Sequence, residues 1–313
     1  MIVVSGTKRS GTSMWMQILT QAGFDFLGKQ FMGKWEQSIG QANPEGFYES
    51  PFRYGIFPKN NPSTAKYMHP KERKFQTIKI FASCIGKTEL AFLHRVIVTL
   101  RPWREYSLSI QRLVDMEDAY TLQQPDKANA VSNQARVIIR HSPLRPALQW
   151  WRDNYRLFTD IYGRGYPVEI VTYDRLLSEH STIIPEVIDW ILLEQTDDIF
   201  RSVPIPTDID VQKALDAVKP DLRTQEKPVY IDDSIPDGAI ETFDLLYHEM
   251  SHPHPQVSKS LVDKLHETHQ IMKGIMLACE REEEDKKRQL LRELGWNSTK
   301  IERELLARKT KKK

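Results

Sequence analysis

The feature that most constrains the fold lies at the start of the chain, where a short apolar run meets a glycine-bounded turn. Ile2–Val4 is apolar, Gly6 and Gly11 enclose four residues, and apolar residues then recur at helical spacing through Trp15–Leu19. This pattern predicts a strand, a tight turn and a helix. The glycines allow the turn amides to point inward, and the helix adds free N–H groups and the positive end of its dipole. The segment therefore predicts a cup for a phosphate or a similar tetrahedral anion.

The cations of this turn do not stand where a nucleotide-binding P-loop has its lysine. The glycine spacing is that of a P-loop, but Thr12 and Ser13 follow the second glycine, and the cations come earlier, at Lys8 and Arg9. An NTPase needs its lysine between the terminal phosphates and a hydroxyl on magnesium. Cations at the entrance of the turn can instead hold one anionic junction and stabilise charge on a departing group. A strand–helix turn that binds nothing is the alternative.

Three further apolar runs are candidate strands: Thr77–Ala82, Arg95–Leu100 and Val168–Thr172. The second of them is β-branched and uninterrupted, as expected of a buried parallel strand. Helical patterns cover 102–113, 147–162 and part of 173–193, whereas 116–131 is expected to be a loop. Strands that alternate with helices predict an α/β fold, with a parallel sheet flanked by helices on both faces.

A second candidate anion site follows the strongest strand. Arg101 comes directly after that strand, and Ser109 lies eight residues further on, inside the next helix. An arginine fork grips a phosphate by two hydrogen bonds, and a hydroxyl adds a third. Because ligands of parallel sheets bind beyond the carboxyl ends of the strands, we expect residues 5–13, Arg101 and Tyr173 at one edge. A structural arginine with a solvent-facing serine is the alternative.

Together these two segments resemble the PAPS-dependent sulfotransferases. In that family Lys or Arg precedes Ser-Gly-Thr-Thr/Ser in the first loop, as Arg9 does here, and a strand ends in Arg with Ser eight residues later. The resemblance covers Met1 to Leu193. It implies a P-loop NTPase-like sulfotransferase fold, PAPS (3′-phosphoadenosine 5′-phosphosulfate) as co-substrate, and transfer of a sulfuryl group to a hydroxyl or amine.

The resemblance also implies a role for each matching residue. The cofactor-binding set that it implies is Lys8, Arg9, Ser10, Gly11, Thr12 and Ser13 on the 5′-phosphosulfate, Arg101 and Ser109 on the 3′-phosphate, and Tyr173 beside the adenine. For Tyr173, a packing role in the core is equally open. Lys79 resembles the family's lysine that reaches the transferring group, and Arg9 would stabilise the departing oxygen. Met14 departs from the pattern, because many cytosolic members carry Trp there.

The general base must differ from that of the animal cytosolic enzymes. Their strand continues Lys-Thr-His, with the His as base, whereas Ile80 and Phe81 follow Lys79 here. In the long polar region 28–74, Asn43–Ser50 resembles the Asn-Pro-x-Gly-aromatic-x-Glu motif of bacterial sulfotransferases. The candidate bases are, in order, Glu49, Glu45, Glu36 and, in reserve, His69. Desolvation makes a carboxylate a useful base by raising its pKa; a salt-bridged surface glutamate is the alternative.

Composition points to one large domain with a tail. The chain has 313 residues and is 40% hydrophobic, so we expect a sulfotransferase-like α/β domain over 1–252 and a helical, basic extension over 253–313. Residues 281–313 hold 12 Lys/Arg against 7 Asp/Glu, a surplus of +5 in a chain whose net charge is +2. Such a modest net charge argues against nucleic acid as the main partner. Oligomerisation through the C-terminal helices is an open expectation.

Several classes are excluded on similar grounds. Cys84 and Cys279 are too few for a disulfide framework, and no apolar run reaches the length of a membrane span. Since the first strand begins at residue 2, we expect a cytoplasmic protein without a signal peptide. No cluster has metal-ligand spacing, so no catalytic metal is expected. The acceptor stays open among small molecules, carbohydrates and lipids. The rival functions are a P-loop kinase or NTPase and a non-catalytic scaffold on the same fold.

Overall fold

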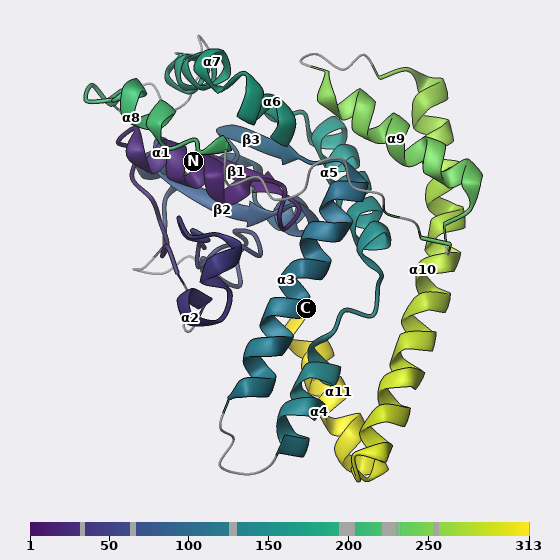
Figure 1. The fold of residues 1–313 in the computed structure, drawn as a ribbon. Helices are drawn as coiled ribbons and strands as arrows, with labels where there is room; N and C mark the ends of the chain where they lie inside the picture. The colour runs from purple at the N-terminus through teal and green to yellow at the C-terminus, as the bar shows by residue number, and fades with distance from the viewer. Residues whose placement is uncertain are drawn as a thin grey trace.

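The fold is built on a sheet of four parallel strands (Figure 1). The computed structural model describes residues 1–31, 35–62, 67–124, 130–193, 204–220, 230, 232–233, 235–252 and 257–312. In spatial order, the strands are β2 (Thr77–Phe81), β1 (Ile2–Gly6), β3 (Arg95–Leu100) and β4 (Val168–Thr172). The central β1 pairs with both β2 and β3, so Ile2 lies opposite Thr77 and Arg95. The predicted α/β class and parallel sheet are confirmed.

Each strand coincides with an apolar run in the sequence, because the sheet is buried on both faces. Every side chain of β1 and β3 is buried, as in a parallel sheet covered on both faces. Successive side chains point to opposite faces, so Ile2 and Val4 enter one core while Val3 enters the other. Strand β2 ends at Phe81, one residue earlier than predicted, because Ala82 begins a 3₁₀ helix (Ala82–Lys87).

Helices cover both faces of the sheet, as predicted. One face packs against α1 (Thr12–Gln21), α6 (Tyr173–Ser178), α7 (His180–Leu192) and α8 (Val211–Asp216). The other packs against α3 (Trp103–Gln123), α5 (Pro146–Arg164), α9 (Asp237–Ser251) and the start of α10 (Lys259–Glu293). On this second face, Phe243 of α9 stacks on Trp151 of α5 with ring centroids 4.7 Å apart. This contact packs α9 onto α5 in the core that covers this face of the sheet.

One helix is longer than the sequence pattern predicts. The segment 116–131 was expected to be a loop, but α3 continues to Gln123, and α4 (Ala130–Arg140) follows within the same stretch. The polar residues that suggest a loop pair with the other helix: Asp118 accepts a hydrogen bond from His141 at 2.6 Å and pairs with Arg140. The loop prediction was therefore wrong over 116–123, since tertiary contacts stabilise polar turns of helix.

The long helix α10 contributes to two packed regions. The first half of α10 buries Leu261, Leu265 and Met272 in the same core as the sheet. Its second half makes a separate small cluster with α4 and α11 (Ser298–Lys312), in which Leu291 meets Ile301. Figure 1 shows these helices reaching away from the sheet. Among the described helices, none combines the length and apolar character that a membrane crossing requires.

Candidate functional site

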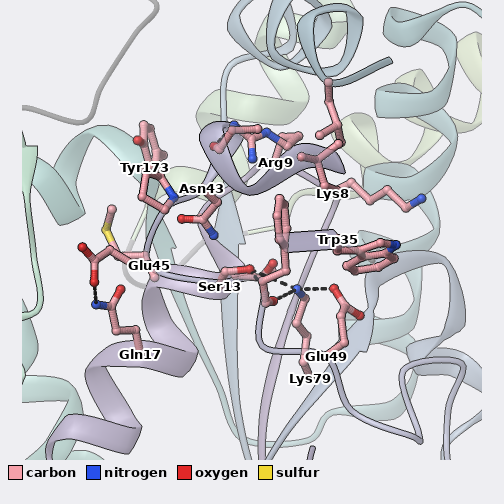
Figure 2. A pocket seen from close by; sticks show the side chains of 18 of the residues that line it. Lys8, Arg9, Ser13, Gln17, Trp35, Asn43, Glu45, Glu49, Lys79 and Tyr173 are labelled. Carbon is pink, nitrogen blue, oxygen red and sulfur yellow. Dashed lines mark hydrogen bonds and ion pairs between the residues drawn. The ribbon is translucent and has the colours of Figure 1, made fainter. Parts of the chain in front are cut away.

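A cavity of about 270 Å³ lies at the carboxyl ends of the strands (Figure 2). Its wall is formed by the loop after β1, the first turns of α1, the end of β2, the first residue after β3, the segment that begins with α2 (Trp35–Ile39), and one side of α3. Ten of the fourteen predicted site residues line it; Ser10, Ser109 and the lower-ranked candidate bases Glu36 and His69 do not. Segments far apart in the sequence thus converge at the edge where ligands of parallel sheets bind.

The loop after β1 is held against β3 by its glycines and by Ser10. At Gly6, a Cβ would lie 2.5 Å from Thr99 Oγ1, so only glycine permits this close approach. Ser10 Oγ bonds to Thr99 Oγ1 at 2.8 Å and donates to the Thr7 carbonyl at 2.7 Å. The Ser10 hydroxyl therefore faces the sheet and fastens the loop, whereas the resemblance had placed it among the ligand contacts.

The start of α1 faces the cavity with its N–H groups uncapped. Gly11 is the N-cap residue, with φ 105° and no side-chain cap, and it lines the cavity together with Thr12 and Ser13. The first N–H groups of a helix have no intrahelical acceptor. Together with the helix dipole they favour an anion at this point. The helix N-terminus on which the predicted anion cup depends therefore lies at the cavity.

Arg101 joins the two predicted anion sites. Its Nη1 donates to the Arg9 carbonyl at 3.0 Å, although 92 residues separate them, and its Nε donates to Glu105 Oε2 at 3.2 Å. The guanidinium lies 4.5 Å from the centre of the Tyr173 ring, and the side chain is buried. The Trp150 indole fixes the backbone by donating to the Arg101 carbonyl at 2.8 Å. Arg101 is therefore rigidly held at the cavity wall.

Positive charge is concentrated around Arg9. Its Nε donates to Ser109 Oγ and its Nη2 to the Ala42 carbonyl, both at 3.0 Å. Burial and the neighbouring charges of Arg101 and Arg112 lower the pKa of Arg9 to about 10, against a smaller opposing effect of the Tyr173 hydroxyl. Crowding of like charges in a half-buried cavity is relieved by an anion. Sequence reasoning missed Arg112, although it lies three residues after Ser109 on one helix face.

The predicted base and the predicted catalytic lysine form a buried ion pair. Lys79 Nζ donates to Glu49 Oε1 at 2.6 Å, to the Phe47 carbonyl at 2.7 Å and to Ser13 Oγ at 3.1 Å. Burial lowers the pKa of Lys79, and the Glu49 carboxylate opposes this effect. Within the described part of the chain, Glu49 Oε2 is buried in the cavity wall and has no hydrogen-bond partner. One carboxylate oxygen is thus held by the lysine, whereas the other makes no hydrogen bond among the described residues.

The loop that carries Glu49 owes its shape to the Asn-Pro-Glu-Gly turn. The Asn43 side-chain amide donates to the Gly46 carbonyl, and Gly46 has φ 97°, which favours glycine. After the turn, Phe47 packs edge-on against Trp35, with ring centroids 5.7 Å apart, and both rings line the cavity. Reciprocal backbone hydrogen bonds of 3.0 and 2.8 Å between Lys29 and Glu49 then fix the backbone of the carboxylate.

The other candidate bases lie elsewhere. Glu45 accepts hydrogen bonds from Gln17 at 3.3 Å and from Lys219 at 2.7 Å, and Figure 2 shows it pointing away from Glu49. Glu36 is exposed on α2 and, like His69, does not line the cavity. The geometry thus separates Glu49 from the lower-ranked candidates. The sequence did not suggest either partner of Glu45: Gln17 follows Ser13 by one helical turn, whereas no sequence signal marks Lys219.

Comparisons of the chain with protein-family models, with curated proteins and with solved structures found no match. In the part of the chain that the structure describes, no group of three or more His, Cys, Asp or Glu side chains is placed to hold a metal ion. The case for a function therefore rests on the cavity itself: an uncapped helix N-terminus, clustered arginines and a buried lysine–glutamate pair.

Proposed function

We propose that this protein transfers a sulfuryl group from PAPS to a hydroxyl or amine of an acceptor. The observation that carries the proposal is the contact between Arg101 and the Arg9 carbonyl, because it brings two anion-binding segments into one cavity. A nucleotide with anionic groups at both its 5′ and 3′ positions needs such a pair of sites. The buried Lys79–Glu49 pair beside them supplies the acid–base groups.

The residues present fit PAPS. The uncapped N–H groups of α1 and the loop around Arg9 suit the phosphosulfate, while the Arg101 guanidinium and the rim residue Arg112 suit the 3′-phosphate. The Tyr173 ring lines the cavity with the Arg101 guanidinium 4.5 Å from its centre, so a nucleobase would contact the part of the ring that the guanidinium leaves open. Since Arg9 and Arg101 repel each other, a bound anion would stabilise both.

The chain's own residues then divide the chemistry among them. Bound PAPS supplies a sulfuryl group on a good leaving group, adenosine 3′,5′-bisphosphate. Glu49 Oε2 accepts the proton of the acceptor hydroxyl. At the same time, the hydroxyl oxygen forms its bond to sulfur. The bond between sulfur and the bridging oxygen breaks, and its electron pair leaves on the 5′-phosphate. Arg9 and the α1 amides hold the charge that develops there.

Ligand binding tests the proposal without knowledge of the acceptor. We expect adenosine 3′,5′-bisphosphate without magnesium to raise the melting temperature, and 5′-ADP, which lacks the 3′-phosphate, to raise it less. At a ligand concentration 100 times the Kd, the stabilisation is about 2.7 kcal/mol. Stabilisation by ATP with magnesium alone would indicate the kinase or NTPase instead. No response to any of these nucleotides would contradict the proposal and favour the scaffold.

Turnover tests the role of Glu49. We expect Glu49→Gln to keep its affinity for adenosine 3′,5′-bisphosphate and to lose about 10²–10⁴-fold in rate, because general-base catalysis contributes that much. Glu36→Gln is the matched control, since Glu36 is exposed outside the cavity. The assay is mass spectrometry of products formed from isotope-labelled PAPS and a lysate of the source organism. Full activity of Glu49→Gln would exclude Glu49 as the base.

A further inference from the structure

Lys79 uses its entire hydrogen-bonding capacity inside the protein. A protonated lysine has three N–H donors. The three acceptors are Glu49 Oε1 at 2.6 Å, the Phe47 carbonyl at 2.7 Å and Ser13 Oγ at 3.1 Å. The side chain is buried, so water does not compete for these donors. In this arrangement Lys79 has no donor left for a transferring sulfuryl group.

The same contact restrains Glu49. The Lys79 ammonium lies 2.6 Å from Glu49 Oε1, and both side chains are buried, so the surroundings screen their attraction poorly. Glu49 Oε1 is therefore held by the lysine. The second oxygen of Glu49, Oε2, is buried and has no hydrogen-bond partner in the described chain, and the residue forms part of the cavity wall. The base is therefore in position but restrained by its counter-ion.

The bond to Ser13 connects this pair to the anion cup. Ser13 lies in the first turn of α1, so the Lys79 ammonium is one hydrogen bond away from the helix N-terminus. The charged groups that act on Lys79 are Glu49, which attracts it, and Lys8 and Arg9, which disfavour its charge. An anion bound at the helix N-terminus would relieve the repulsion from both cations, and a sulfuryl group carried on that anion would bring its oxygens to the ammonium as a second partner.

We propose that Lys79 is a positioning residue that keeps Glu49 paired until the donor binds, and that the sulfuryl oxygens then draw the ammonium away from Glu49. The inference rests on the proposed function and adds an order to it: the donor binds first, and only then does Glu49 become a strong proton acceptor. Glu49, left buried without its counter-ion, gains proton affinity. The arrangement prevents the base from acting before a sulfuryl group is in place.

Proton linkage tests this order without an acceptor and without turnover. The experiment is calorimetric titration of the intact protein with PAPS at pH 6.5, in two buffers that differ in ionisation enthalpy. We expect more protons to be taken up by the wild type than by Glu49→Gln, which cannot titrate at this position. Adenosine 3′,5′-bisphosphate lacks the sulfuryl group, so it should give equal proton exchange in both proteins. Glu36→Gln, altered outside the cavity, should match the wild type with both ligands.

The outcomes separate the two proposals. If neither nucleotide binds, the proposed function is wrong. If both bind and the PAPS-specific difference between wild type and Glu49→Gln is absent, Lys79 does not release Glu49, and the function proposal stands alone. Glu49→Met, which removes the carboxylate at similar length, provides the same comparison should Glu49→Gln fail to fold. A difference that appears equally with both ligands would also overturn the inference, because it would not depend on the sulfuryl group.

Discussion

Replacing Arg101 by methionine separates two roles of one side chain, holding the site together and binding an anion. In the wild type, Arg101 pairs with Glu105 at 3.2 Å and donates to the Arg9 carbonyl at 3.0 Å, in a buried environment. Methionine keeps an apolar stem of similar length but removes the charge and every donor. Glu105, itself buried, then loses this counter-ion.

The expected cost follows from that burial. Removing one partner of a buried ion pair costs about 3–5 kcal/mol. The lost hydrogen bond to the Arg9 carbonyl is worth about 1.5–3 kcal/mol alone, but it shares the same side chain, so the two values do not add. We therefore expect the free energy of unfolding to fall by about 3–5 kcal/mol, a large part of a typical stability of about 5–15 kcal/mol. Urea denaturation measures the change, with an unaltered m-value as the sign of two-state unfolding.

Two further variants make the result interpretable. Arg175 and Glu179 form a pair of the same i,i+4 spacing and the same 3.2 Å distance, but their side chains are 35% and 50% exposed, so Arg175→Met should cost no more than about 0.5 kcal/mol. In Arg101→Met/Glu105→Leu, most of the stability should return while affinity for adenosine 3′,5′-bisphosphate stays lost. A loss below about 1 kcal/mol in the single variant, or near wild-type affinity in the double variant, would refute this reasoning.

Two more predictions concern the backbone of the anion cup and the packing of α10. Gly11→Ala should lower stability by about 1–2 kcal/mol, because its φ is 105° and a Cβ would lie 3.0 Å from Tyr173; Gly163→Ala, with open space in α5, should instead raise it by about 0.5–1 kcal/mol. His269 stacks on Tyr155 at 4.0 Å, and burial, with nearby positive charge, lowers its pKa below 6.5. Below pH 6.5, His269 binds a proton more readily in the unfolded chain than in the folded protein. The free energy of unfolding should therefore fall between pH 7 and 5.5, and it should fall less steeply in His269→Gln. Equal slopes in the two proteins would contradict this.

Much of the fold follows from local patterns in the sequence. Each strand coincides with an apolar, β-branched run, and Gly6 and Gly11 stand where the backbone needs them. The position of Arg101 follows from topology, since parallel strands end at one edge of a sheet. The extension of α3 to Gln123 could not be predicted locally, because its stabilising partners are Arg140, the last residue of the next helix, and His141, which follows it.

The sequence alone determined most of the segments that surround the cavity, because strand periodicity, glycine positions and the order of strands and helices are local or topological properties. Tertiary packing decided what the side chains do there. It turned Ser10 toward Thr99, placed Glu49 on Lys79 rather than in solvent, and drew Glu45 to Lys219. Pairings between residues 30 to 174 positions apart depend on how whole segments pack against one another, and no local pattern encodes that.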